Sequence, residues 1–234
     1  GVRAGAASAK EVTASGVDVG IQDGTTTLGL GSANATGVNA GGVGIEKLGL
    51  TGGTGSIGPK GTQLGAKGVT ATGISADKTA VKQATASDVS VGVVDGNTTL
   101  GVGSLDAGGI QAAGIGIDTL GVKGGKASLK SSGEADLSAK RATAKGISAG
   151  TTKVKGAQAS GLSVGIRGET TNLGVDSAYA TGVSATGASA GDVSINGGSA
   201  TLGGGRTSLG AKSATANQVA VGDATMAQVG GTDA

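Results

Sequence analysis

Apolar residues recur along this chain in two alternating patterns, and each pattern occupies a run of sixteen residues. Counted from the turn-like pair Asp77-Lys78, the first run has apolar residues at positions 5, 8, 10, 13, 15 and 17. Counted from Asp95-Gly96, the next run has them at positions 6, 8, 11, 13, 16 and 18. If the second run folds back on the first, positions that sum to 21 become partners and the apolar sets mirror each other. The pattern therefore predicts antiparallel strands that share one apolar face.

Written in rows of eighteen from Gly5, the whole chain follows this alternation with one inserted residue, in the row that begins at Ser131. The single proline, Pro59, falls at a row start, where its missing N–H costs least. Pairs of Asp and Gly suit the positive φ of two-residue hairpin turns. Such pairs begin five rows: Asp23-Gly24, Gly41-Gly42, Asp95-Gly96, Gly204-Gly205 and, reversed, Gly222-Asp223. We therefore expect 12–13 antiparallel rows joined by two-residue hairpins, with the inserted residue in a turn.

The inward positions are separated by alternating steps of two and three residues, so the rows are not flat strands. Each step of three leaves two neighbouring residues on the outside, and these doublets face one another in the expected register, which predicts a shared bend. Glycine tolerates the backbone conformations that sharp bends need, and Ser or Asn can bond the local backbone. The doublets are Ser15-Gly16, Thr51-Gly52, Thr72-Gly73, Gly108-Gly109, Lys123-Gly124, Ser160-Gly161 and Asn196-Gly197.

This spacing is similar to that of pentapeptide-repeat solenoids, but in geometry only, because rows of eighteen residues that reverse at hairpins depart from that family. The predicted fold is all-β: antiparallel 18-residue rows bent into an elongated, solenoid-like rod around an interior of small aliphatic side chains. At ~4.8 Å per row the rod would be roughly 60 Å long. A large curved sheet or barrel is the alternative reading of the same pairing.

A longer repeat of about 72 residues, four rows long, is superimposed on the rows. Similar stretches begin at Ala14, Ala86 and Ala159. No linker separates them, so we expect a single continuous β-repeat domain over residues 1–234. Its three units are 5–76, 77–149 and 150–221, followed by a partial row at 222–234.

Composition narrows the classes of function. The chain has 51 Gly, one Tyr (Tyr179) and no Phe, Trp, His or Cys, and its net charge is +2 without charged blocks. Without aromatic side chains to stack on bases, a nucleic-acid partner is not expected. The missing Cys excludes disulfides and thiolate metal sites and fits a secreted bacterial protein. No apolar run approaches 18 residues, so no membrane-spanning helix is expected. The first ten residues lack a signal-peptide pattern, which suggests a processed or excised chain.

Two short motifs resemble catalytic or nucleotide-binding signatures. Gly161-Leu162-Ser163-Val164-Gly165 matches the nucleophile elbow G-x-S-x-G, but that chemistry needs a His base, which the chain lacks. Gly53, Gly55 and Gly58 match G-x-G-x-x-G, but no helix is predicted after them. We therefore predict no catalytic and no cofactor-binding residue, and no cofactor.

The remaining polar patterns are expected to be structural. The acidic residues form no calcium-binding repeat, so no metal-ligating residue is predicted and the carboxylates are assigned to solvation. Two glycosylation sequons, at Asn34 and Asn97, are not expected to be used. A threonine recurs at position 4 of even rows, where we expect hydroxyl-to-backbone bonding rather than an ice-binding face. The acidic residues are Asp18, Asp23, Glu46, Asp88, Asp95, Asp118, Glu134, Asp136 and Glu169, and the threonines are Thr26, Thr62, Thr98, Thr171 and Thr207.

These observations favour a non-enzymatic structural protein: a stalk, shell or spacer segment of a larger secreted or surface-exposed bacterial assembly. One alternative is a carrier whose groove holds lipid or another apolar ligand. Another is a shell or passenger segment of a secreted toxin. Unpaired terminal rows would present open sheet edges, so protein partners or self-association through those rows are expected, whereas a lipid partner has no direct support in the sequence.

Overall fold

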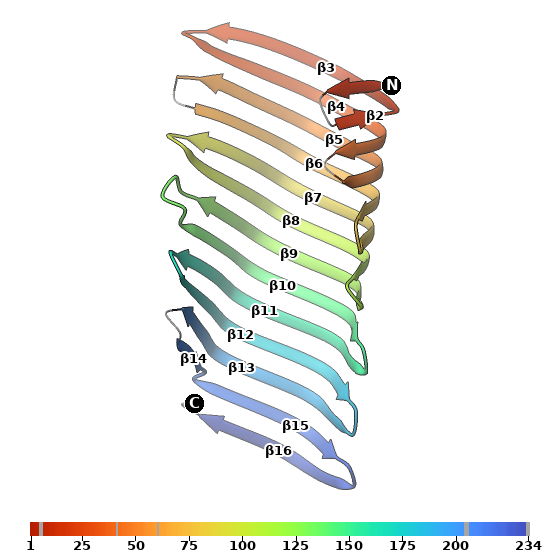
Figure 1. The fold of residues 1–234 in the computed structure, drawn as a ribbon, viewed down its shortest axis with the longest axis vertical. Coiled ribbons are helices and arrows are strands. Elements are labelled where there is room, and N and C mark those ends of the chain that lie inside the picture. The colour runs from red at the N-terminus through yellow and green to blue at the C-terminus, as the bar shows by residue number, and fades with distance from the viewer. Residues whose placement is uncertain (5–6, 41, 60, 204–205, 233–234) are drawn as a thin grey trace.

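The computed structural model describes residues 1–4, 7–40, 42–59, 61–203 and 206–232. Within these residues the fold is all-β, and sixteen strands form one elongated antiparallel sheet (Figure 1). No helix occurs in this described part, and therefore none that could cross a membrane. The strands are β1 (Val2–Ala4), β2 (Ala7–Ala9), β3 (Glu11–Gln22), β4 (Thr25–Ala40), β5 (Val43–Gly58), β6 (Gly61–Ala76), β7 (Thr79–Val94), β8 (Asn97–Ala112), β9 (Ile115–Leu129), β10 (Ala135–Ala149), β11 (Thr152–Arg167), β12 (Thr170–Ala185), β13 (Ala188–Gly203), β14 (Arg206–Gly210), β15 (Ser213–Val221) and β16 (Ala224–Thr232).

The pairing register is the one that the apolar pattern predicts. In β7 and β8, Val91 pairs with Leu100 and Val81 with Ile110, so that partner positions sum to 21. Val89 and Val102 lie on the same side of the sheet, since both line one apolar hollow. Every neighbouring pair of strands is antiparallel, which confirms the chain reversal at each row.

Two-residue turns join most rows, as expected. They lie at 23–24, 77–78, 95–96, 113–114, 150–151, 168–169, 186–187 and 222–223. At Asp23-Gly24 and Asp95-Gly96 both turn residues have positive φ, which is the type I′ geometry that matches strand twist. The predicted hairpins at Gly41-Gly42, Pro59-Lys60 and Gly204-Gly205 fall partly or wholly outside the described residues.

The inserted residue of the eighth row lies in a turn, as predicted. Leu129 pairs with Ala135, so residues 130–134 form a five-residue loop in place of a two-residue hairpin. The Lys130 N–H donates to the Glu134 carbonyl at 2.8 Å and closes this loop. The strand register on either side is unchanged because the loop absorbs the extra length.

Two bends cross the sheet at the doublets that the sequence identifies. Rows alternate in which bend has a residue with a positive φ near 50–60°: the first, third and later odd rows have it at one bend and the even rows at the other, and the strand ladder skips a pair of positions at each bend. We call the two lines of residues bend A and bend B. The positive-φ residues of bend A are Gly16, Gly52, Asp88, Gly124, Gly161 and Gly197, and those of bend B are Gly37, Gly73, Gly109, Gly146, Gly182 and Gln218.

The bends divide each long strand into three short panels. Panel 1 runs from bend A to the hairpins at 23–24, 95–96 and 168–169, panel 2 lies between the bends, and panel 3 lies beyond bend B. Serine pairs bridge neighbouring strands along bend A, with Oγ–Oγ distances of 2.7–2.9 Å. These pairs are Ser15–Ser32, Ser87–Ser104 and Ser160–Ser177. Small polar residues thus lie at the bends as expected, but these serine hydroxyls bond one another across strands and not the local backbone.

The rows near the two ends depart from the sixteen-residue plan. The first row is split into β2 and β3 at Lys10, and the twelfth is split into β14 and β15 at Ala211 and Lys212. Both breaks fall at bends, where the ladder is already interrupted. Each broken row also lacks a full-length neighbour on one side, because β1 and β16 are short. Less strand pairing therefore holds the broken row together at its bend.

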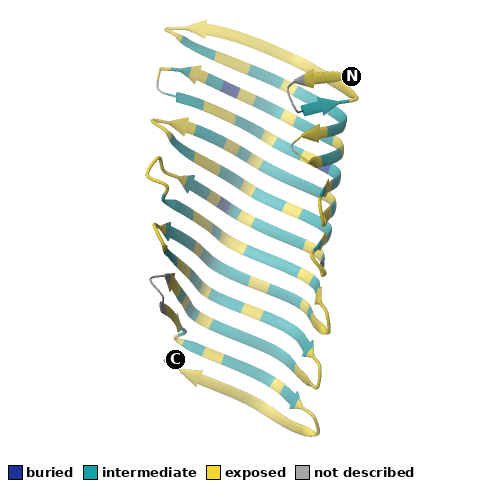
Figure 2. Ribbon diagram, viewed as in Figure 1, coloured by how far each residue is buried: buried dark blue, intermediate teal, exposed yellow. Residues whose placement is uncertain are grey.

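The interior of the bent sheet is open. Ala71, at 8% exposure, is the one apolar residue of the described chain that is classed as buried, and Figure 2 shows intermediate and exposed residues along almost every strand. The order of strands runs from β1 to β16, and these two strands do not pair in the described chain, so the sheet is not closed. The elongated bent sheet is confirmed, but its small aliphatic side chains line an open trough and do not form an enclosed centre.

Candidate functional site

The apolar side of panel 1 contains two adjoining hollows. The first has a volume of about 460 Å³ and spans β7 to β11, and the second has about 610 Å³ and spans β11 to β14. Leu162 and Val164 of β11 belong to both hollows and therefore form the ridge between them. The strand alternation points these side chains to the trough side of the sheet.

The hollows follow a size pattern along one column of panel 1, directly beside bend A. Two large residues alternate with two small ones on successive strands, and the pattern repeats three times. From the N-terminal end the column reads Val17, Leu30, Gly53, Ala66, Val89, Val102, Gly125, Ala139, Leu162, Val175, Gly198 and Ala211. The floors of the two hollows contain its small members, Gly125 and Ala139 in one and Gly198 and Ala211 in the other.

Panel 2 compensates for the small residues across bend A. A Cβ atom built at Gly53 would lie 2.9 Å from Leu50 Cδ2, and one at Gly198 would lie 3.4 Å from Ile195 Cγ2. Strands with glycine in panel 1 thus carry a large side chain on the panel 2 side of the same bend. Val122 and Ile195 form the walls of the hollows in this way, and side chains of the neighbouring strands lie against the floor glycines, since a Cβ atom built at Gly125 would lie 2.7 Å from Val102 Cγ1.

Long polar side chains cover the glycines of the bends. A Cβ atom built at Gly52 would lie 2.8 Å from the Cγ and Cδ atoms of Lys67, and one at Gly109 would lie 2.5 Å from Lys82 Cδ. At Asp88 the arrangement is reversed. Asp88 has the positive φ and carries the covering side chain, and Gly103 on the neighbouring strand has no side chain and leaves room for it. Along bend B the covering residues alternate in sign. They are Lys10, Glu46, Lys82, Asp118 and Lys155.

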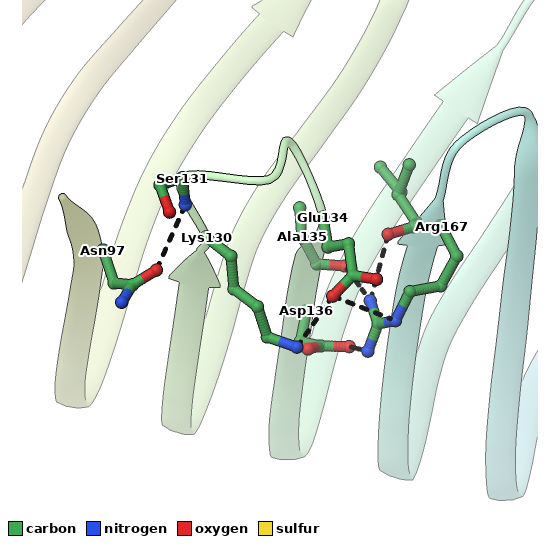
Figure 3. Close-up of polar contacts among 8 residues, drawn as sticks. Asn97, Lys130, Ser131, Glu134, Ala135, Asp136 and Arg167 are labelled. Carbon is green, nitrogen blue, oxygen red and sulfur yellow. Dashed lines mark hydrogen bonds and ion pairs between the residues drawn. The ribbon is translucent and has the colours of Figure 1, made fainter. Parts of the chain in front are cut away.

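The loop at 130–134 carries a small cluster of ion pairs on the rim of panel 1 (Figure 3). Lys130 Nζ donates to Glu134 Oε2 at 2.7 Å, and Arg167 Nη2 donates to Asp136 Oδ1 at 2.6 Å. The hydrogen bond from Lys130 and its charge lower the pKa of Glu134 below its ordinary value, and the hydrogen bond to Asp136 raises the pKa of Arg167. All four groups are solvent-accessible, so the cluster orders the loop and offers no buried reactive group.

Tyr179 lies on the convex side of panel 2, as the pattern predicts. It is 46% exposed, and its hydroxyl donates to Asp192 Oδ1 at 2.8 Å. That hydrogen bond raises the pKa of the Tyr179 phenol. The only aromatic side chain of the chain is therefore directed away from the trough.

The two sequence motifs have structural positions. Ser163 pairs with Ser138 and Gly174 in the middle of β11, which continues to Arg167, so the G-x-S-x-G match forms no sharp strand-to-helix elbow. Gly53, Gly55 and Gly58 lie within β5, each in a strand pair. Ser163 has no His base, because the chain contains none, and no helix follows the three glycines in the described chain.

The polar residues singled out in the sequence are dispersed over the sheet. In the described chain no three of the Asp and Glu side chains come close enough to hold a metal ion. The sequon residue Asn34 lies within β4, and Asn97 Oδ1 accepts a hydrogen bond from the Ser131 N–H at 3.1 Å. The position-4 threonines pair with apolar residues of the neighbouring strands, for example Thr98 with Val93 and Leu129.

The expected hydroxyl-to-backbone bonds occur one position away from where they were predicted. Thr27 Oγ1 and Thr99 Oγ1 lie 3.4 and 3.5 Å from the carbonyls of Gly20 and Gly92. These residues follow Thr26 and Thr98 directly, and they point to the convex side. Their carbonyl partners are available because Gly20 and Gly92 have no side chain in the way.

The apolar pattern along the chain predicted the inward positions of all three panels. It did not predict the hollows of panel 1 or the side chains that cover the bend glycines. Both are visible when the eighteen-residue rows are read down their columns, because the size alternation beside bend A and the sign alternation along bend B appear only there. Comparisons of the chain with protein-family models, with curated proteins and with solved structures find no match.

Proposed function

We propose that this chain is a non-enzymatic structural segment, a stalk, shell or spacer of a larger secreted or surface-exposed bacterial assembly. The observation that supports it best is the unbroken register through all three 72-residue units, from β4 to β13. Such a sheet grows by about 4.8 Å for each row and needs no central core. The scattered charges on its convex side keep it soluble.

Deleting one complete unit tests the spacer role. Removal of residues 77–149 joins Ala76 to Gly150, so a two-residue turn replaces a two-residue turn and all remaining rows keep their pattern. The shortened chain should stay folded, and small-angle X-ray scattering should show its longest dimension reduced by about 19 Å, the height of four rows. A shortened chain that unfolds, or that keeps its original length, would contradict a modular spacer.

A carrier of lipid or another apolar ligand is the second candidate, favoured by the open hollows of panel 1. Their lining is almost wholly aliphatic, and leucines such as Leu100 and Leu137 are 49% and 44% exposed. A carrier should co-purify with lipid that organic extraction and mass spectrometry detect. Lipid-free protein that also fails to bind a fluorescent fatty acid would exclude this role.

A further inference from the structure

The two ends of the sheet leave strand edges open (Figure 1). At one end β1 covers only the short strand β2, so the outer edge of β3 has no partner in the described chain. At the other end β16 pairs with β15, whereas the outer edge of β14 has no partner among the described residues. The four most exposed large apolar side chains lie on these two open strands. They are Val17, Val19 and Ile21 of β3, at 62%, 62% and 78% exposure, and Leu209 of β14, at 77%.

Neither edge carries the usual protection against further pairing. Natural sheets discourage it with proline or lysine in the edge strand, or with a very short strand. β3 has twelve residues and contains neither proline nor lysine. β14 carries one charged residue, Arg206, at its first position. Both edges are therefore suited to pairing with a further strand.

The joints between the 72-residue units show which strand fits beside β14. β6 ends the first unit and β7 begins the second, and β10 and β11 stand in the same relation at the next joint. Panel 1 of these joints contains the pairs Leu64–Val91 and Leu137–Val164. Leu209 holds the same position in the last row of the third unit, and Val19 holds it in the first row of the first unit. A second copy with its β3 beside β14 would thus repeat a joint that the sheet already makes twice.

The neighbouring trough-side positions of the joints agree with this register. In each joint a small residue in the last row of one unit pairs with a large residue in the first row of the next. These pairs are Ala66–Val89 and Ala139–Leu162. Ala211 and Val17 hold the equivalent positions at the two ends of the sheet. End-to-end contact would therefore combine small and large side chains as the interior of the sheet does.

β16 occupies part of the place that the second copy needs. Its nine residues begin a thirteenth row along β15, and all of them are exposed. β3 is longer and would pair with β14 as well as with β15. β1 similarly lies along β2, in the place that Val219 and Val221 of the preceding copy would take. Two copies can therefore join only when these two short strands move aside.

We propose that copies of this chain join end to end, with β3 of one copy replacing β16 along β14 and β15 of the next. The joint builds on the proposed spacer role, because each added copy would lengthen the sheet by about 58 Å, the height of twelve rows. The copies are related by the same step that relates one unit to the next. The trough and both bends therefore continue through the joint, and no panel of one copy meets the trough of the other.

β16 acts in this proposal as a competitor held within the same chain. A tethered strand has a high effective concentration at its own site, which opposes replacement by a strand from another molecule. The replacement strand offers more contacts, because β3 brings Val17, Val19 and Ile21 to β14, which β16 does not reach. Weakening β16 should therefore favour the joint.

Two proline substitutions in β16 test this competition. Val221 and Ala224 flank the two-residue turn, so they form a hydrogen-bonded pair, and such pairs alternate along the ladder. The N–H of Met226 consequently points to β15, and that of Thr225 points to the open edge. Met226→Pro should release β16 and lower the concentration at which chains join by at least about tenfold, measured by sedimentation velocity. Val229→Gly, a milder change in the same strand, should act in the same direction.

Thr225→Pro is the matched control, because a proline at this position leaves the bonds to β15 in place. It should join no more readily than the wild type, and circular dichroism should show all variants folded. Electron microscopy of Met226→Pro should show rods that lengthen in steps of about 58 Å.

Mixing two blocked variants establishes which edges meet. In the Met226→Pro background, Val19→Lys places a charge on the edge of β3, and Leu209→Lys places one on the edge of β14, and such charges oppose strand addition. Each blocked variant alone should remain monomeric. An equal mixture should form a heterodimer and nothing larger, because each variant supplies one intact edge.

Several results would overturn the proposal. A Met226→Pro chain that is folded and monomeric would do so, as would a wild type that joins as readily as Met226→Pro. Self-association of either blocked variant alone would overturn it in favour of pairing between like ends. None of these results bears on the spacer role, since the unit deletion measures the length of a single copy.

Discussion

The bends and panel 1 are built on opposite principles. At the bends every glycine has a specific neighbour, as where the side chain of Lys67 lies against Gly52, and little space remains. On panel 1 the side chains are large but half exposed, as with Leu100 and Leu64 at 49% and 48%. The shape of the sheet is thus fixed along two narrow lines, and the apolar surface between them and the hairpins stays available to a partner.

This difference explains how a sheet with so little buried surface can hold its shape. Bending is imposed locally by positive-φ glycines and by the polar side chains that cover them, strand by strand. Most apolar residues stabilise the sheet through cross-strand pairs within one face, each of them a small contribution. The predictions below test whether the bends carry the close packing that panel 1 lacks, beginning with the largest expected effect.

Placing a side chain at a covered bend glycine should be more destabilising than at an open turn glycine. Gly52 has φ +58° and a Cβ atom there would lie 3.0 Å from Lys67 Cβ, whereas Gly187 has φ +72° and no atom within 4 Å of the same point. Gly52→Ala should lower the free energy of unfolding by about 2–4 kcal/mol, from strain plus overlap, and Gly187→Ala by about 1 kcal/mol, from strain alone. Urea denaturation measures both.

Removing the covering side chain separates the two contributions. In the double variant Gly52→Ala/Lys67→Ala the contacts with Lys67 Cγ and Cδ at 2.8 Å disappear, while the 3.0 Å contact with the Cβ atom remains, so its loss should lie between those of Gly52→Ala and Gly187→Ala. Equal losses for Gly52→Ala and Gly187→Ala would show that the bend is not closely packed.

An exchange of size across bend A should be tolerated better than either single change. Gly53→Val introduces a side chain beside Leu50 and should cost about 1–3 kcal/mol by overpacking. Adding Leu50→Ala reproduces the arrangement that Ala86 and Val89 have in β7, so the double variant should regain at least half of that loss. Thermal unfolding followed by circular dichroism measures the effect, and a strictly additive double variant would argue against compensation across the bend.

A better turn residue at position 113 should stabilise the protein slightly. Ala113 has φ +47° in a type I′ turn with Gly114, a conformation that Asn adopts more readily than Ala. Ala113→Asn should raise the free energy of unfolding by about 0.5–1 kcal/mol. Asp95→Asn at the equivalent turn is the control and should change little, since Asp already favours this geometry. An Ala113→Asn variant that is less stable than the wild type would refute the turn assignment.

The smallest expected effect concerns the pH dependence of the exposed cluster at 130–134. The pKa of Glu134 is lowered in the folded chain by Lys130. Its carboxylate therefore contributes stability above the unfolded pKa of this residue, and the contribution is lost as the pH falls through the lower folded value. NMR titration should place the Glu134 pKa below its ordinary value, and Lys130→Ala should bring it back. A Glu134 pKa that Lys130→Ala does not move would exclude this ion pair in solution.

Much of the architecture follows from spacing alone, because a period of two or three fixes which side of a strand each residue faces. The antiparallel register, the hairpins and the bend glycines are of this kind, down to Gly16, Gly73 and Gly109. The open trough could not be predicted, because the angle at each bend decides whether the panels close on one another, and spacing carries no angle. The hollows depend on residue size in a column that joins neighbours eighteen positions apart, which a reading along the chain passes over.

The nearly sequential strand order also constrains how the polypeptide reaches this state. Every long strand pairs only with rows directly before and after it, so its contacts never require distant parts of the chain to find each other. Such local topology allows each new hairpin to add to those already formed, as the chain emerges from a ribosome or an export channel. Assembly by successive addition suits a protein whose rows are near-copies of one another, because a hairpin that docks immediately on its predecessor has little time to mispair with an equivalent row elsewhere.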